Sequence, residues 1–276
     1  MISVLILTRN EEDDLPGCLD SVLWSNDVHV FDSESADRTS DIARSHGATV
    51  TSRAFTNYAD QRNAALTTLH FKNPWLLILD ADERPTPELA AEMQHAVAEA
   101  AEATGAFRIR RRDYLWGTWL KHAQITPFYI RLVRLGRARY TREINEMLEV
   151  DGNVLDLREP FDHFPFSKGI SHWIAKHNTY STMEAQLIAT RDATQNASLH
   201  TAIFGRDFTE KRAAQKAIFY KLPARPALKW IYMMFFRGAI LDGSAGVTYA
   251  TLQTIYEYMI VLKTREIKNE ARRRVY

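Results

Sequence analysis

Residues 75–83 read Trp75-Leu76-Leu77-Ile78-Leu79-Asp80-Ala81-Asp82-Glu83. The continuous apolar run that opens this stretch is typical of a strand buried on both faces of a sheet. The three acids that follow repel one another and lose hydration when buried, so we expect a positive partner to neutralise them. Such oxygen ligands suit Mg²⁺ or Mn²⁺, which typically join one or two carboxylates to substrate phosphates. The alternative is that Arg84 or Arg62 pairs with the acids without a metal.

Strand and helix patterns alternate on either side of this stretch. Helical spacing and the capping triplet Thr86-Pro87-Glu88 predict helices at 11–24, 40–46, 57–71 and from residue 86 onward. A mainly apolar run predicts a strand at 2–7, and further strands are predicted at 28–31 and 49–53. This alternation predicts an α/β fold with a mostly parallel central sheet and crossover helices. Beyond about Gly105, period-two alternation predicts half-exposed strands at 106–109, 129–133 and 144–150, and a helical region follows from about Ser167.

Polar side chains follow the predicted strands where each strand ends. The first strand is followed by Thr8-Arg9-Asn10-Glu11-Glu12, and the second by Asp32-Ser33-Glu34-Ser35. Ligands bind outside the carboxyl ends of strands in open α/β sheets, so these groups and the Asp80 cluster are expected to converge on one crevice. A helix cap is an equal alternative for Asp32 alone, but not for the three groups together.

Composition and charge narrow the class of protein. The 276 residues carry a net charge of +1, which gives no global field for nucleic acid, and Cys18 is the single cysteine, which favours a reducing compartment. Residues 201–276 hold 14 Lys and Arg against 6 Asp and Glu. This basic tail predicts an anionic partner, such as a membrane surface or a phosphorylated acceptor, although a solvated helical face is the even alternative. The first seven residues resemble a strand more than a signal peptide, and no apolar run approaches the ~20 residues of a membrane span.

Four motifs stand in a characteristic order: Thr8-Arg9-Asn10-Glu11, Asp32 to Thr39, Gln61-Arg62-Asn63-Ala64-Ala65 and Asp80-Ala81-Asp82-Glu83. Weaker signatures follow at Arg131-Leu132-Val133-Arg134, Asn145-Glu146, Val150-Asp151-Gly152 and Asp242-Gly243 with Gly246. Together they resemble the family 2 glycosyltransferases, most closely the subgroup that builds lipopolysaccharide cores. The resemblance implies a Rossmann-like GT-A domain at residues 1–166, with a nucleotide-sugar-binding half at 1–104 and an acceptor-binding, catalytic half at 105–166. Residues 167–276 are then a helical C-terminal extension.

The resemblance also implies roles for individual residues. Thr8, Asn10 and Glu11 would line the nucleotide pocket, and Asp32 would bond the base edge. Arg62 would lie near the diphosphate, Asp80 with Ala81 near the ribose or the metal, and Asp82 would be the last acid of the Asp-any-Asp metal motif. The implied cofactor is Mg²⁺ or Mn²⁺, and the implied partners are a nucleotide-sugar donor, with a UDP-hexose the family's commonest case, and a glycan or glycolipid acceptor.

Direct displacement at an anomeric carbon needs one general base for the acceptor hydroxyl. Our candidate is Glu146, although the related subgroup has His where this chain has Asn145; Asp113 and Glu143 compete. Arg112, Tyr114 and Trp116 are candidates for acceptor binding, because arginine grips phosphate and aromatic faces stack on sugars, but a mere solubility role is equally common. His163 is interpreted as a packed loop histidine rather than a metal ligand.

The basic and aromatic helices of the tail fit either a membrane interface or packing on the sheet, and we expect both. The resemblance thus implies an inverting, metal-dependent glycosyltransferase that acts on a lipopolysaccharide inner core, in the cytoplasm and peripheral at the inner face of the plasma membrane. Polyprenyl-linked, capsular and protein acceptors are alternatives within the class. A nucleotidyltransferase would need a Gly-rich, Lys-bearing loop after the first strand, and a non-catalytic nucleotide-sugar-binding protein would not depend on Glu146. A Rossmann dehydrogenase is disfavoured because no G-x-G-x-x-G follows the first strand.

Overall fold

The structure, a computed structural model, describes residues 1–124, 128–141, 147–190, 198–204 and 208–273. The chain forms two compact units. The first unit comprises Met1–Tyr114 and Ile125–Ser167, and the second comprises Leu115–Gln124 and Lys168–Tyr276. The second unit therefore takes a short excursion of the chain as well as its C-terminal part.

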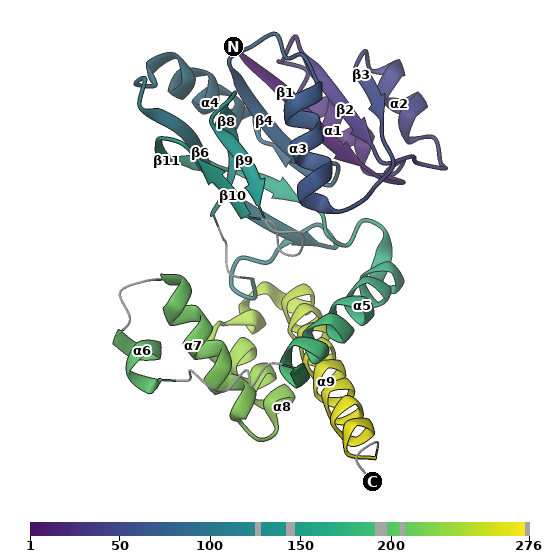
Figure 1. Ribbon diagram of the computed structural model, residues 1–276, viewed down its shortest axis with the longest axis vertical. Coiled ribbons are helices and arrows are strands. Elements are labelled where there is room, and N and C mark those ends of the chain that lie inside the picture. The colour runs from purple at the N-terminus through teal and green to yellow at the C-terminus, as the bar shows by residue number, and fades with distance from the viewer. Residues whose placement is uncertain (125–127, 142–146, 191–197, 205–207, 274–276) are drawn as a thin grey trace. The chain divides into compact units, whose positions relative to one another are not determined.

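The parallel half of the first unit's sheet has the predicted strand-helix alternation (Figure 1). Strand β1 pairs in parallel with both β2 and β4, and β2 pairs in parallel with β3. The elements are β1 (Ile2–Thr8), α1 (Leu15–Ser21), β2 (Val28–Asp32), α2 (Thr39–Ser45), β3 (Thr49–Ser52), α3 (Tyr58–Thr68) and β4 (Trp75–Asp80).

The other half of this sheet mixes directions. The strand order is β3-β2-β1-β4-β8-β6-β11-β5, in which β8 is antiparallel to β4 and β6 while β11 is parallel to β6. The strand β11 and the short β5 were not predicted. The elements are β5 (Glu83–Pro85), α4 (Pro87–Glu99), β6 (Thr104–Leu115), β8 (Phe128–Arg134) and β11 (Asn153–His163), with a separate ribbon of β9 (Ala138–Thr141) and β10 (Met147–Val150).

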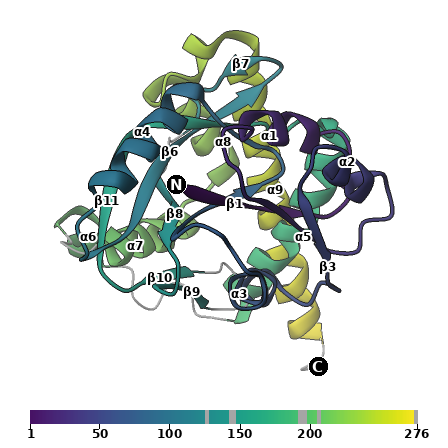
Figure 2. The same ribbon diagram turned by 90° about the horizontal axis from the view of Figure 1, so that it is seen from above.

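Successive residues of β1 point to opposite faces of the sheet, and both faces are covered, which explains the apolar run from Val4 to Leu7. Val4 and Ile6 pack with side chains of α1, α2 and α4. Leu5 packs on the other face with side chains of α3 and β9. Figure 2 shows α4 beside β11 and α3 beside the β9–β10 ribbon. Burial on both faces holds the carboxyl ends of the central strands rigidly at one edge.

Two helix starts in this unit show how local sequence sets the boundaries. The Thr86 hydroxyl accepts a hydrogen bond from the Leu89 amide at 3.1 Å, and proline occupies the first turn of α4, as predicted. The Asn57 side chain likewise accepts from the Asp60 amide at 2.8 Å and begins α3. Helix α3 carries Gln61 and Arg62 toward the carboxyl edge of the sheet.

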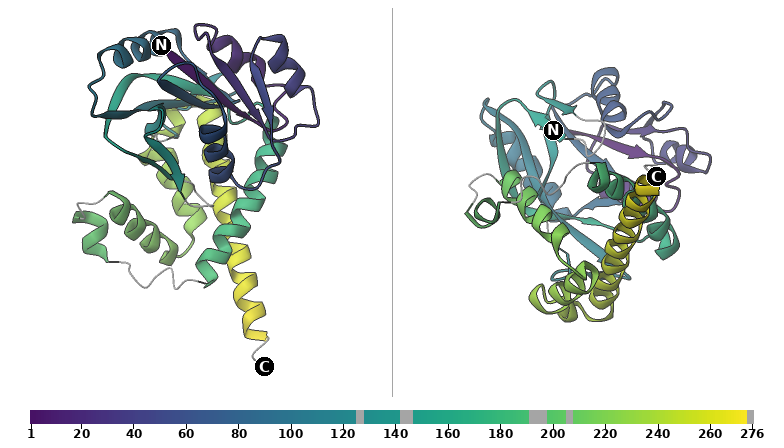
Figure 3. Two further views of the ribbon diagram at one scale, coloured as in Figure 1. Left: turned by 45° about the horizontal axis from the view of Figure 1, so that its top comes forward. Right: turned by 60° about the horizontal axis from the view of Figure 1, so that its bottom comes forward.

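The second unit is helical, as the sequence predicts from about Ser167 onward. Helix α5 runs beside α9, while α8 also packs on α9 and α6 packs on α7 (Figure 3). Among the described residues, no helix combines the length and apolarity required to cross a membrane. The elements are β7 (Thr118–Trp119), α5 (Gly169–Thr190), α6 (Leu199–Phe204), α7 (Phe208–Lys221), α8 (Arg225–Ile231), the π-helical turn η1 (Tyr232–Phe236), the 3-10 turn η2 (Ala239–Asp242) and α9 (Gly243–Arg273).

Candidate active site

The register of the parallel strands brings the predicted polar groups to one edge. Thr8 lies opposite Asp32, and Leu7 lies opposite Asp80. The Thr8 hydroxyl donates to the Asp32 carboxylate at 2.7 Å. The strand ends that the sequence singled out are therefore neighbours.

Asp32 is held as a fixed hydrogen-bond acceptor. Asp32 is 1% exposed. Besides the hydrogen bond from Thr8, its carboxylate accepts hydrogen bonds from the amide and the hydroxyl of Ser35 at 2.9 and 2.6 Å. Donors on both the β1 and β2 ends orient this carboxylate, so its position is set before any ligand arrives.

The loops after β1 and β2 are tied to each other by backbone and side-chain bonds. Asn10 adopts a left-handed backbone with φ of 54°, its amide donates to the Ser35 hydroxyl, and its side-chain oxygen accepts from the Ala36 amide, both at 2.8 Å. The Glu11 amide donates to the Thr39 hydroxyl at 2.8 Å. The backbone amides of Asn10 and Glu11 and the side-chain oxygen of Asn10 thus join the loop after β1 to the loop after β2. We call these two residues the wall beside Asp32.

Asp80 lies between two arginines. Its oxygens accept from Arg62 and Arg131 at 2.9 Å each, and Arg131 also bonds the fully buried Glu83. Burial alone raises the pKa of Asp80, but the charges of Arg131 and Arg62 outweigh burial and hold that pKa well below its usual range. Arg62 therefore pairs with Asp80, whereas Arg84 lies over the Phe164 ring at 4.2 Å.

Asp82 has a different partner, His163. The imidazole Nε2 lies 3.3 Å from Asp82 Oδ2, and Nδ1 lies 2.5 Å from Oδ1 of Asp113, which in turn pairs with Arg111 at 2.9 Å. Burial lowers the pKa of His163, but the charge of Asp82 and the hydrogen bonds to Asp113 and Asp82 outweigh it and raise the pKa to about 9. The interpretation of His163 as a loop histidine is wrong, because it ends strand β11 and faces the acid cluster.

Asp82 offers a carboxylate oxygen to a divalent cation, and the neighbouring His163 could offer Nε2 once a metal displaces the proton that this nitrogen shares with Asp82. Asp82 ends in a carboxylate whose side chain is 28% exposed, and His163 presents a ring nitrogen beside it. Within the described residues no group of three or more His, Cys, Asp or Glu side chains forms a closed cage for a metal. An open pair of this kind fits Mg²⁺ or Mn²⁺, which commonly take their remaining ligands from water and substrate phosphates.

Three carboxylates are candidates for the general base. Glu146 and Glu143 lie outside the described residues. Asp113 is 3% exposed and is held by His163 and Arg111, so it is poorly placed to meet an acceptor hydroxyl.

Two of the three predicted acceptor-binding residues contact side chains of their own unit. Arg112 pairs with Asp162 at 2.6 Å, and the ring of Tyr114 stacks on Phe164 with centroids 5.3 Å apart. Trp116 belongs to the second unit and is 65% exposed. The structure thus ties Arg112 and Tyr114 to the end of β11.

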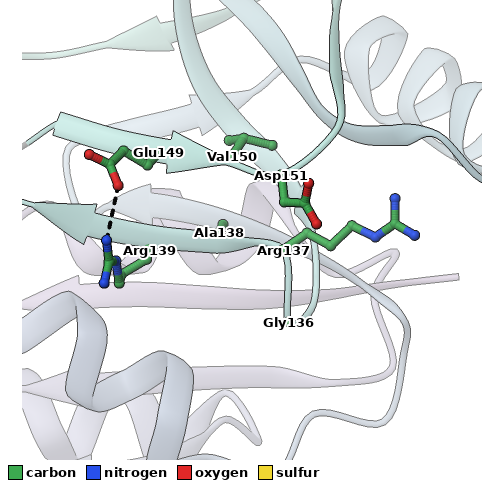
Figure 4. A pocket seen from close by; sticks show the side chains of 7 residues that line it. All are labelled: Gly136, Arg137, Ala138, Arg139, Glu149, Val150 and Asp151. Carbon is green, nitrogen blue, oxygen red and sulfur yellow. Dashed lines mark hydrogen bonds and ion pairs between the residues drawn. The ribbon is translucent and has the colours of Figure 1, made fainter.

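A pocket of about 360 Å³ lies elsewhere in the first unit, at the β9–β10 ribbon (Figure 4). Arg139 and Glu149 pair across it at 3.1 Å. Its lining shares no residue with the acid cluster: Gly136, Arg137, Ala138, Arg139, Glu149, Val150 and Asp151. This pocket is therefore distinct from the acid cluster.

The family model of Glycosyl transferase family 2 matches residues 3–164, which is more than half of the chain. The chain belongs to the family 2 glycosyltransferases. The family match and the observed sheet confirm the predicted GT-A class of fold with a helical C-terminal extension. The enzyme class, a glycosyltransferase, is confirmed with it.

Three relatives of this glycosyltransferase cover different shares of it. The lipopolysaccharide core biosynthesis glycosyltransferase LpsC of Rhizobium meliloti (strain 1021) is 25% identical over 272 residues, 95% of this chain and 91% of that protein. An uncharacterized glycosyltransferase of Rickettsia bellii (strain RML369-C) is 39% identical over 98 residues, only 35% of this chain and 33% of that protein. The solved mannosyltransferase PcManGT of Pyrobaculum calidifontis, in complex with GDP-Man and Mn²⁺, has a TM-score of 0.49 at 16% identity, covering 95% of this chain and 86% of that one.

Sequence reasoning assigned no role to two residues of the glycosyltransferase site, Arg131 and His163. Arg131 stood inside the apolar run of residues 128–133, and a lone arginine in such a run signals a buried ion pair. His163 had no such signal, because β11 was not predicted and its pairing with β6 brings His163 opposite Asp113.

Proposed function

We propose that this family 2 glycosyltransferase moves a sugar, with inversion, from a nucleotide-sugar donor to the inner core of a lipopolysaccharide. The observation that carries the proposal is the convergence of Thr8, Asp32, Asp80 and Asp82 at one edge of the sheet. The name of the relative LpsC supports the acceptor, and a UDP-hexose donor rests on the resemblance alone. Polyprenyl-linked, capsular and protein acceptors are the alternatives that an acceptor panel would separate.

Donor binding is assigned to the loops after β1, β2 and β4. Asp32, already oriented by Thr8 and Ser35, accepts from the base edge, and the wall built by Asn10 and Glu11 encloses the nucleotide. Arg62 and Arg131 hold Asp80 and supply positive charge beside the path of the diphosphate. Ala81 is buried, and its small side chain leaves the backbone between the two acids close to the donor.

Asp82 and His163 would hold the divalent cation, which supplies positive charge to the departing diphosphate. The support is that the Asp82 carboxylate and the His163 Nε2 lie 3.3 Å apart, so that both could bind one cation that displaces the proton between them. Asp113, which pairs with Arg111, contacts the other ring nitrogen of His163 and orients the imidazole.

In the transfer step the acceptor hydroxyl oxygen forms a bond to the anomeric carbon while the bond from that carbon to the diphosphate oxygen breaks. The proton of the hydroxyl passes to a carboxylate, which we assign to Glu146. The burial and pairing of Asp113 favour this assignment over Asp113. Arg112, Tyr114 and Trp116 are the proposed contacts for the acceptor.

A lipopolysaccharide acceptor places the enzyme at the cytoplasmic face of the inner membrane. The basic C-terminal helices support peripheral attachment there, because residues 201–276 carry a strong excess of Lys and Arg.

The decisive experiment measures binding and slow hydrolysis across a panel of nucleotide sugars, with and without Mn²⁺. Wild type is compared with Asp82→Ala, Glu146→Gln and the control Asp156→Ala, whose carboxylate lies half-exposed on β11 in a pair with Arg108. We expect wild type to hydrolyse one donor in the presence of Mn²⁺. This hydrolysis is expected to be lost in Asp82→Ala and unchanged in Asp156→Ala. Glu146→Gln is expected to bind that donor but not turn it over.

Two results would contradict the proposal. If folded wild type binds no nucleotide sugar, the glycosyl donor is misassigned. If the donor binds but Glu146→Gln hydrolyses it as fast as wild type, the base lies elsewhere.

A further inference from the structure

The second unit exposes a dense apolar strip between α8 and α9. Within ten residues, five large apolar side chains are more than half exposed: Tyr232 53%, Phe235 65%, Phe236 79%, Ile240 54% and Leu241 70%. Exposed apolar residues scattered singly are ordinary, but a contiguous group marks a surface that meets something apolar. We call residues 232–241 the apolar strip.

Neighbouring aromatic rings group on this strip. The rings of Tyr232 and Phe236 stack with centroids 6.2 Å apart, and Trp230 meets Phe235 edge-on at 6.3 Å. The residues between them, Met233 and Met234, are buried. The π-helical turn therefore anchors its inner side in the unit while its aromatic side chains project outward.

The backbone of the strip is fixed rather than loose. A Cβ on Gly246 would stand 2.0 Å from the Ala239 carbonyl oxygen, so the first turn of α9 packs directly on η2. Gly238, with φ of 77°, makes the bend between η1 and η2. A rigid projecting turn can present apolar side chains without collapsing them onto its own unit.

The one charged residue within the strip, Arg237, is basic. Residues 221–241 contain four basic residues and no acid. Arg225 and Lys229 face the buried Glu257 at 3.4 and 3.9 Å, whereas Arg237 is half-buried on the strip itself. Lys221, which ends α7, is exposed.

The nearest acid in the sequence is turned inward. Asp242, whose side chain is 3% exposed, accepts hydrogen bonds from the amides of His122 and Ala123 at 2.9 and 2.7 Å and lies 2.6 Å from His122 Nδ1. Its charge is therefore used inside the unit and does not repel an anionic surface.

We propose that the apolar strip inserts into the interfacial layer of an anionic lipid bilayer. Aromatic side chains beside basic residues, with no exposed acid among them, match a surface that is apolar below and anionic above. Side chains that project from a turn suit a fluid layer better than the shaped pockets in which protein interfaces bury their anchors. The proposal rests on the peripheral attachment described above and assigns it to one element.

The test is co-sedimentation of the full chain with vesicles of phosphatidylcholine alone or of an equimolar mixture with phosphatidylglycerol. The test variant is Phe235→Ser with Phe236→Ser. The control is Leu199→Ser with Phe204→Ser on α6, where the two side chains are 66% and 68% exposed. We expect wild type and control to bind the anionic vesicles, and the test variant to lose at least about tenfold in partitioning because two rings no longer leave water.

A second variant guards against misfolding. Phe236→Trp keeps an aromatic ring, so it is expected to bind anionic vesicles like wild type and to show a blue shift of tryptophan emission that is absent without vesicles. Donor hydrolysis in solution is expected to survive in all variants, so a lack of donor hydrolysis in wild type would count against the glycosyltransferase assignment and not against the strip.

Equal vesicle binding by wild type and the Phe235→Ser, Phe236→Ser variant would overturn the proposal. So would a dimer of wild type in sedimentation that this variant abolishes without change in vesicle binding, because the strip would then meet a second copy of the chain.

Discussion

The imidazole of His163 stands between two carboxylates, with Nδ1 2.5 Å from Asp113 Oδ1 and Nε2 3.3 Å from Asp82 Oδ2. An ionised carboxylate can only accept hydrogen bonds, so Asp113 holds a proton on Nδ1 and Asp82 faces the proton on Nε2, which a metal would have to displace before Nε2 could bind it. Carboxylates that orient a histidine ligand in this way tune its affinity for metal.

Asp113→Asn is therefore expected to weaken Mn²⁺ binding by about 10–100-fold. Titration followed by electron paramagnetic resonance measures the affinity without requiring turnover. Asp162→Asn is the matched control, because Asp162 neighbours His163 on β11 but pairs with Arg112. Unchanged Mn²⁺ affinity in folded Asp113→Asn would show that His163 needs no such orientation, or binds no metal.

Arg131→Met is expected to lower the free energy of unfolding by about 3–5 kcal/mol, because it leaves the buried Glu83 and the Asp80 carboxylate without their shared cation. Arg62→Met is expected to cost less, since Arg131 still holds Asp80. The exposed pair of Arg108 with Asp156 gives the control, for which Arg108→Met is expected to cost about 0–1 kcal/mol. Urea unfolding compares the three, and equal losses would mean that Arg131 is not the principal counter-charge.

The sequence predicted the parallel half of the fold well, because β1 and β4 are mainly apolar and polar turns follow β1, β2 and β4. Asp32 and Asp80 could be placed at one edge from that pattern alone, since carboxyl ends of parallel strands lie together. The ion pairs of Asp80 were foreseen only as an alternative, and only for Arg62.

The rest depended on long-range pairing. Strand β11 has exposed residues over much of its length, so its sequence lacks a strong strand pattern, and its register with β6 alone brings His163 to Asp113. Arg131 reaches the acid cluster because β8 lies antiparallel to β4. The family resemblance includes the segment Arg131-Leu132-Val133-Arg134. Local sequence, however, does not show which strand pairs with the strand that contains Arg131.

Asp27 offers a test of pH-dependent stability away from the site. Burial raises the pKa of Asp27, but hydrogen bonds from Ser3, the Lys72 amide and His29 outweigh burial and leave the pKa below its ordinary value. A depressed carboxyl pKa stabilises the fold above the pKa of the unfolded chain, and this stability is lost as pH falls through the folded pKa.

Asp27→Asn is therefore expected to lower the free energy of unfolding by about 1.5–3 kcal/mol at neutral pH, with the difference from wild type shrinking below about pH 4. Chemical denaturation at a series of pH values measures both. Donor hydrolysis serves as the control, because Asp27 precedes β2 at the end of the sheet opposite to Asp32. A difference that stays constant down to acid pH would contradict the assigned hydrogen bonding.

Gly246 gives a physical reason for the Asp242-Gly243 and Gly246 signature. An added Cβ would meet the Ala239 backbone oxygen at 2.0 Å and Asp242 Cβ at 2.7 Å, and backbone cannot move away cheaply. Gly246→Ala is expected to destabilise the second unit by about 1–3 kcal/mol or more, since overpacking forces backbone shifts.

Gly17→Ala is the matched control for this glycine. The atoms nearest to its Cβ would be those of the Arg84 guanidinium, at 2.5 Å, which a flexible side chain can move away, so the expected change is within about 0.5 kcal/mol. Because η2 carries Ile240 and Leu241, loosening its contact with α9 is also expected to weaken binding to anionic vesicles. A Gly246→Ala protein that melts and binds vesicles like wild type would show that α9 and η2 can separate freely, and the rigid support of the apolar strip would then be wrong.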